Sequence, residues 1–188
     1  MRTILSQNTS DVNSNRAFSR LRERFSSWEQ VRDGDLEAIV EAIEPGGLGR
    51  IKAPRIQGAL HAITQERGNL DLEFLKEIEL DEARAWLESL VGVGPKTAAC
   101  VLLFSLGRPV LPVDTHVHRI SRRLGLIEPR TSAERAHEIL GEALPDGEIY
   151  DFHVNMVSHG RQVCRAQRPR CDVCVLAPQC DYLHRGRR

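Results

Sequence analysis

The residues best suited to chemistry lie in two short segments near the middle of the chain. Lys96 follows two glycines and a proline in Leu90-Val-Gly-Val-Gly-Pro-Lys-Thr-Ala98. If a helix begins at the proline, Lys96 lies in its first turn, where the positive end of the helix dipole disfavours an ammonium ion. Nucleophilic catalysis through a Schiff base requires a neutral amine, and this position would suit it. The alternative is a lysine that only contacts phosphate. Asp114, in Val113-Asp-Thr-His116, could stabilise positive charge on a substrate or only cap a helix.

The glycine-rich stretch before Lys96 predicts a tight connection between two helices. Gly92 and Gly94 suit a hairpin that needs left-handed backbone, and glycine also lets the backbone approach a phosphate. Pro95 favours a helix start, whose free N–H groups form an anion site. The segment therefore predicts a helix-hairpin-helix that binds the DNA backbone, with Gly92, Gly94 and Thr97 as contacts. Many such hairpins are binding modules without catalysis.

Four cysteines form a compact set near the C-terminal end of the chain. Their spacing is Cys164-x6-Cys171-x2-Cys174-x5-Cys180. Four thiolates in such a stretch could bind tetrahedral zinc or a [4Fe–4S] cluster, and the spacing alone does not exclude zinc. The fifth cysteine, Cys100, is expected to be a small core residue in an apolar helix.

The elements that would position these residues are all helical. Hydrophobic periodicity, caps and helix-stopping residues predict an all-α fold, and no segment shows the alternation of a strand. A helix end is expected at residues 3–7. The other expected helical segments are residues 21–25, 35–44, 54–67, 81–90, 95–106, 115–124, 132–144 and 151–160.

Composition excludes some classes of protein. The 188-residue chain has 41% hydrophobic residues and a formal net charge of zero, which argues against a protein that coats nucleic acid electrostatically. The charge is uneven, because acids predominate in residues 66–88 and arginines in residues 161–188. We find no apolar run of the roughly 18 residues that a membrane span needs, and no signal peptide, so a cytoplasmic protein is expected.

The segment from Leu90 to Leu124 resembles the helix-hairpin-helix/Gly-Pro-Asp superfamily of DNA glycosylases. Lys96 followed by Val-Asp-Thr-His is especially similar to endonuclease III, whereas adenine-specific relatives typically carry serine at the lysine position and mismatch-thymine relatives often carry tyrosine. The resemblance implies a bifunctional glycosylase and AP lyase that removes oxidised pyrimidines, with Lys96 as the nucleophile and Asp114 as the essential carboxylate. It also implies a helix-hairpin-helix lobe over residues 1–109 and a cluster lobe over residues 110–188, with the active-site cleft between them.

The same resemblance extends to the cysteine loop. Its spacing matches the endonuclease III loop that holds a [4Fe–4S] cluster, which implies that residues 164–180 hold this cofactor in a structural and DNA-binding role. Arg165, Arg168 and Arg170 could meet phosphates there. His116 and His118 lie on different faces of their helix, so both are expected to be structural or DNA-facing rather than metal ligands. His116 is included among the candidate DNA contacts.

Two further sites are implied by the need to extrude a base and fill the gap that it leaves. One filler in this family comes from a segment resembling Leu5-Ser-Gln-Asn-Thr-Ser-Asp11. The usual glutamine position is Asn8 here, with Gln7 beside it, so either residue is a candidate. Leu48 is the candidate for a second wedge, and the alternative is a leucine that only packs in a turn.

The expected partner is double-stranded DNA that contains damaged bases or abasic sites. The protein is expected to act as a monomer associated with the nucleoid. Two rival functions remain open. One is a monofunctional glycosylase for mismatched uracil or thymine, or for alkylated bases. The other is a non-catalytic DNA-binding relative.

Overall fold

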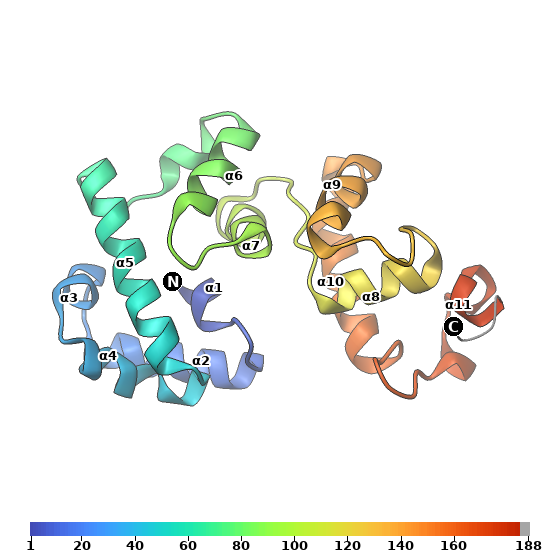
Figure 1. Ribbon diagram of the computed structural model, residues 1–188, viewed down its shortest axis with the longest axis horizontal. Coiled ribbons are helices and arrows are strands. Elements are labelled where there is room, and N and C mark those ends of the chain that lie inside the picture. The colour runs from blue at the N-terminus through green and yellow to red at the C-terminus, as the bar shows by residue number, and fades with distance from the viewer. Residues whose placement is uncertain (185–188) are drawn as a thin grey trace. The chain divides into compact units, whose positions relative to one another are not determined.

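The computed structural model describes residues 1–184 and is built from helices (Figure 1). The described residues contain α-helices and short 3-10 helices but no strand, which confirms the predicted all-α class. The chain forms two compact units, Met1–Val101 and a second that begins at Leu102. The division of roles between lobes at residues 109 and 110 stays a prediction. Within the described part of the chain, no helix has the length and apolar character to span a membrane.

The first unit packs short helices around the long helix α5. Helix α4 packs against α2 and α5, and α3 packs against α5. Leu21, Ile39 and Ile56 are fully buried in this core. Polar N-caps start three of the helices: Ser10, Ser27 and Asp35 accept hydrogen bonds from backbone N–H groups of α2, α3 and α4. The elements are α1 (Arg2–Leu5), α2 (Asp11–Arg24), α3 (Trp28–Asp33), α4 (Leu36–Ile43), η1 (Glu44–Gly46), α5 (Gly49–Arg67), η2 (Glu73–Lys76), α6 (Leu80–Ser89) and α7 (Pro95–Leu106).

The second unit is built around helix α8, which packs against α10 and α11. Its core includes Val117 and Ile120 of α8, with Leu140 and Met156 from the following helices. Part of α7 contributes Leu103 to this core. The elements are α8 (Thr115–Leu124), α9 (Ala133–Ala143), η3 (Asp146–Glu148), α10 (Ile149–Gln162), η4 (Cys171–Val173), η5 (Ala177–Gln179) and α11 (Asp181–His184).

The helices beside the candidate site have the bounds that the sequence predicts. Helix α7 runs from Pro95 to Leu106 and α8 from Thr115 to Leu124. Helix α5 differs, because it begins at Gly49 and carries Pro54 inside it, whereas the sequence places its start at the proline. Helix α3 was not predicted, since its six residues are too few to show a period.

Candidate active site and cysteine pocket

The loop between α6 and α7 is a tight hairpin. The backbone N–H of Val93 donates to the carbonyl of Leu90 at 3.0 Å, and Gly92 has a left-handed φ of 81°. A Cβ atom at Gly92 would lie 2.5 Å from the side chain of Arg55. Glycine is required there both by its backbone angle and by this close approach. At Gly94, by contrast, φ lies outside the left-handed region and the surrounding space is open.

Gln7 ties the N-terminal turn to this hairpin. Its amide nitrogen donates to the carbonyl of Gly92 at 2.9 Å and to the hydroxyl of Thr97 at 3.0 Å. Thr97 is buried, and by accepting this hydrogen bond its side chain links the hairpin to the N-terminal turn. A DNA contact by Thr97 stays a prediction. The neighbouring Asn8 is exposed and has a left-handed φ of 52°. The two candidates for the gap filler therefore differ, because only the Gln7 side chain is held by the hairpin.

Lys96 is the second residue of α7 and is half-buried in the first unit. The helix starts there because the carbonyl of Gly94 accepts hydrogen bonds from the N–H groups of Thr97 and Ala98, at 2.9 and 3.0 Å. A primary amine thus lies in the first turn, where the positive helix end favours anions over an ammonium ion. Cys100, further along α7, is buried in the core as predicted.

Asp114 is the N-cap of α8 in the second unit. One carboxylate oxygen accepts hydrogen bonds from the N–H groups of His116 and Val117, both at 2.8 Å. Two buried or half-buried histidines fix the segment before it. His137 and His153 each donate from Nδ1, at 2.8 Å, to the carbonyls of Leu111 and Pro112 respectively. The carboxylate is therefore held by the start of α8, and the backbone before it is held by two histidines that the sequence analysis missed.

The two histidines of α8 are bound within the protein. The Nε2 atom of His118 donates to the carbonyl of Thr131 at 2.8 Å. His116 packs on Gly160 so closely that a Cβ atom there would lie 2.6 Å from its Nδ1 atom. The same atom accepts a hydrogen bond from Arg119 at 3.0 Å. A DNA contact by His116 stays a prediction.

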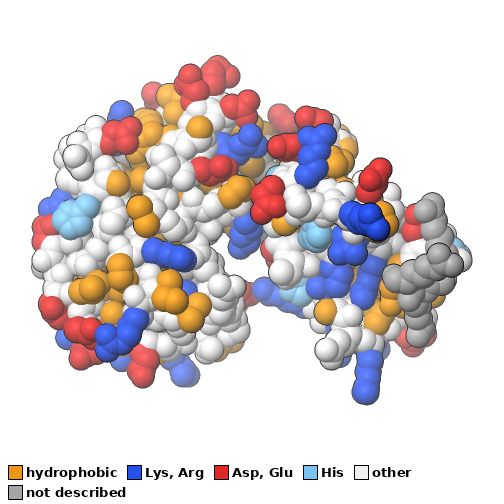
Figure 2. Space-filling view, in the orientation of Figure 1, with side chains coloured by type: hydrophobic (Ala, Val, Ile, Leu, Met, Phe, Trp, Pro, Cys, Tyr) orange, Lys and Arg blue, Asp and Glu red, His pale blue; other side chains and the backbone are white. Residues whose placement is uncertain are grey.

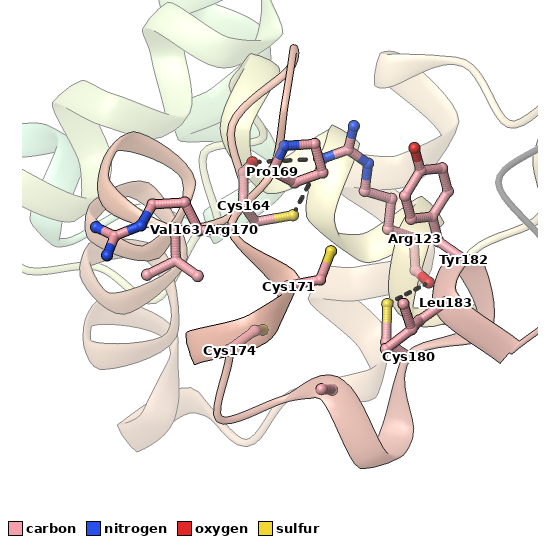
Figure 3. A pocket seen from close by; sticks show the side chains of 11 residues that line it. Arg123, Val163, Cys164, Pro169, Arg170, Cys171, Cys174, Cys180, Tyr182 and Leu183 are labelled. Atoms are coloured by element: carbon pink, nitrogen blue, oxygen red, sulfur yellow. Dashed lines mark hydrogen bonds between the residues drawn. The ribbon is translucent and has the colours of Figure 1, made fainter.

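The four C-terminal cysteines line one pocket in the second unit (Figure 3). Cys164, Cys171, Cys174 and Cys180 turn their sulfur atoms toward the same central space in that view. Among the described residues, no three Cys, His, Asp or Glu side chains are gathered tightly enough for a single metal ion. The thiols therefore surround a pocket and do not meet at one point.

Two arginines of α8 hold the beginning of the cysteine loop. Arg119 donates from Nε and Nη2 to the carbonyl of Cys164, at 3.1 and 3.0 Å. Arg123 donates to the Cys164 sulfur at 3.2 Å and to the carbonyl of Arg165 at 2.7 Å. Burial lowers the pKa of the Arg119 guanidinium from its usual value. Helix α8, which follows Asp114, thus also holds the beginning of the cysteine loop. In the sequence, the only sign of this role is the four-residue spacing of the two arginines, which places them on one face of the helix.

Three more arginines lie in the loop between the first two cysteines. Arg165, Arg168 and Arg170 are exposed, and Arg168 has a left-handed φ of 49°. Lys and Arg side chains gather on the visible face of the second unit (Figure 2). A phosphate contact by Arg165, Arg168 or Arg170 stays a prediction.

Leu48 does not behave as a packed turn residue. Its side chain is 49% exposed, and its backbone is left-handed, with φ 55° and ψ 33°, immediately before α5. Left-handed backbone is strained for a residue with a branched side chain. A role for Leu48 as the wedge stays a prediction.

The sequence of this chain matches known families. Residues 1–146 match the family described as HhH-GPD superfamily base excision DNA repair protein. Endonuclease III of Thermotoga maritima is 35% identical over 183 residues, covering 97% of this chain and 81% of that protein. Endonuclease III of Sulfolobus acidocaldarius is 32% identical over 182 residues, covering 96% and 79%. A predicted DNA glycosylase of Arabidopsis thaliana is 37% identical over 161 residues, and the chain spans 55% of its length.

Solved structures agree with the sequence matches. A non-covalent endonuclease III–DNA complex matches with a TM-score of 0.84, and a trapped endonuclease III–DNA covalent intermediate matches with 0.83. Each is 32% identical, and the match covers 98% of this chain and 82% of the solved chain. The chain therefore belongs to the helix-hairpin-helix/Gly-Pro-Asp superfamily of base-excision repair proteins and, within it, to the endonuclease III branch of DNA glycosylases.

Proposed function

We propose that the protein is a bifunctional DNA glycosylase and AP lyase for oxidised pyrimidines, with Lys96 as its nucleophile. The observation that carries this proposal is the distribution of side-chain amines. The sequence has three lysines. Lys52 is buried and bonded to two carbonyls, and Lys76 forms an ion pair with Glu73. Lys96, at the start of the hairpin helix, is the amine that remains for a substrate.

The reaction assigns a separate task to each catalytic residue. The neutral amine of Lys96 attacks C1′ of the extruded nucleotide as the bond to the base breaks, and the base leaves with the bonding electrons and takes up a proton. Asp114 stabilises the positive charge that develops on the sugar, accepts a proton from the Lys96 amine after it has attacked C1′, and returns one to the ring oxygen. The sugar ring opens to an imine on Lys96. Loss of a C2′ proton then expels the 3′ phosphate by β-elimination, and water releases Lys96.

The direct test of this function is borohydride trapping. Hydride reduces an imine to a stable amine, so protein and DNA become covalently joined only if the intermediate forms. We expect a trapped complex with duplexes that carry thymine glycol or an abasic site. Base release from thymine glycol without trapping on either duplex would indicate a monofunctional glycosylase. Binding without base release or cleavage on any single-lesion duplex would indicate a non-catalytic relative.

We also propose that the four cysteines hold a [4Fe–4S] cluster. Four thiolates around one pocket match the donor set of such a cluster, and the guanidinium of Arg123 beside the Cys164 sulfur suits a negatively charged thiolate. When bound, the cluster would stabilise the loop that carries Arg165, Arg168 and Arg170 and would take no part in base removal.

The cluster has a visible consequence for the purified protein. We expect a yellow-brown preparation with broad visible absorption and about four iron atoms per chain, because each cysteine ligates one iron. Cys171→Ser or Cys174→Ser should lower the soluble yield, since ligation is part of folding. Cys100→Ser is the matched control and should keep the colour. A colourless protein that contains one zinc ion would contradict the assignment.

The arginines of the cysteine loop should contribute to binding without reading sequence. Arg168→Ala and Arg170→Ala should each weaken binding to abasic DNA by similar factors in all sequence contexts, and each should reduce the salt dependence of binding by about one phosphate contact. Fluorescence anisotropy titrations at several salt concentrations measure both effects. Arg84→Ala, in the first unit, is the control. A loss confined to one sequence context would show that these side chains do not act as backbone contacts.

A further inference from the structure

Lys52 of α5 is a buried cation that the proposed chemistry does not use. Its side chain is 1% exposed, and its ammonium group donates to the carbonyls of Leu5 and Gly46, both at 2.8 Å. Both acceptors are neutral, and burial lowers the pKa of Lys52. An apolar side chain of similar length would avoid the cost of desolvating a charge, but it would leave both carbonyls without this donor. The position of its two acceptors suggests what the lysine does.

Each acceptor stands immediately before a segment that carries a candidate DNA-distorting residue. Leu5 ends α1 and is followed by the turn with Asn8, and Gly46 ends η1 and is followed by Leu48. The two carbonyls are 41 residues apart in the sequence, yet one ammonium group binds both. Lys52 therefore joins two loops that lie far apart in the sequence.

Both loops have left-handed backbone at the candidate DNA-distorting residue. Asn8 has a φ of 52° and Leu48 a φ of 55°, and Arg168 is the one other non-glycine residue with positive φ in the described part of the chain. Such conformations persist when surrounding contacts enforce them. The last carbonyl before each loop is an anchor of this kind, because the chain cannot relax at that point without losing the hydrogen bond to Lys52.

We propose that Lys52 is a positioning residue that sets the separation of the Asn8 and Leu48 loops for base extrusion. This inference rests on the proposed function and adds a residue that acts before the chemical step. Lys52 touches neither substrate nor reacting atoms. It holds the two loops so that Asn8 fills the gap left by the extruded nucleotide while Leu48 wedges the duplex. Gln7, bound to Gly92 and Thr97, fixes the same turn from its other side.

The test compares a paired lesion with the same lesion in a bubble of mismatches, where extrusion costs little. Wild-type base release and trapping establish the proposed function independently. For Lys52→Met we expect single-turnover base release from the paired duplex to slow by ~10- to 100-fold. A loss of this size is typical when a substitution away from the chemistry displaces functional groups by about 1 Å. Release from the bubble should change by less than about threefold. Adding Lys52→Met to the Asn8→Ala/Leu48→Ala double variant should cause little further loss, since the residues act through one step.

A merely structural role predicts a different pattern. Ile63→Ala, at the other end of α5, removes a buried side chain that holds neither loop and serves as the control for lowered stability. It should affect both substrates alike. If Lys52→Met does not fold, Lys52→Gln retains two N–H donors and should show the same selectivity in a weaker form. Equal losses on paired and bubble substrates, or no loss on either, would overturn the inference.

Discussion

Lys96→Gln should abolish imine trapping and strand cleavage while leaving the protein folded and able to bind DNA. Glutamine keeps a polar side chain of similar length at the second position of α7, so the hairpin and its hydrogen bonds should survive. It has no amine to form the imine, and neither of the other lysines is available to replace it. The measurement is single-turnover cleavage, with borohydride trapping, of one duplex carrying thymine glycol and one carrying an abasic site.

The control for Lys96→Gln is Lys76→Gln, which removes an exposed lysine of the same unit. That change breaks the ion pair with Glu73, and exposed pairs contribute little to stability, so activity should remain near wild type. DNA affinity and visible absorption should match wild type in both variants. Near wild-type cleavage of both duplexes by Lys96→Gln would contradict the lyase mechanism, because the imine would then have to form elsewhere.

The parts of the site that the sequence predicts are those with local signals. Proline at the first position of α7, aspartate before α8 and glycine after α8 mark helix ends by their own backbone chemistry, and both helices have the predicted bounds. The same rule failed at α5. Pro54 lies inside that helix, and the start is set instead by Leu48, whose left-handed backbone no local pattern indicates.

The parts that the sequence could not predict depend on contacts between distant residues. Lys52 meets Leu5 across 47 positions, and Arg119 meets Cys164 across 45. Nothing in the immediate neighbourhood of either side chain indicates these partners. The difference between Gln7 and Asn8, the two candidates for the gap filler, also depends on a distant contact. Gln7 binds the hairpin more than 80 residues away, and nothing next to it in the sequence indicates this. The candidate reactive residues can therefore be predicted from a single sequence more readily than the residues that hold them in place.

Asp114→Asn should slow base release by about 10²- to 10³-fold, the loss expected when transition-state electrostatics are removed. The fold should survive, because the Asp114 oxygen that caps α8 only accepts hydrogen bonds, and an asparagine carbonyl can accept the same two. The substitution thus removes the negative charge without removing the cap. Asp114→Ala is the comparison, since it removes both and should also lower the melting temperature.

The informative quantity for Asp114→Asn is the difference between two substrates. Release of thymine glycol passes through a positively charged sugar, so it needs the carboxylate. Cleavage at a pre-formed abasic site starts from an open-chain aldehyde and has no such charge to stabilise, so it should be affected much less. Single-turnover rates on both duplexes decide between the two roles. Equal losses would show that Asp114 acts throughout as a proton shuttle, whereas a loss confined to base release would place its charge in the step that breaks the bond to the base.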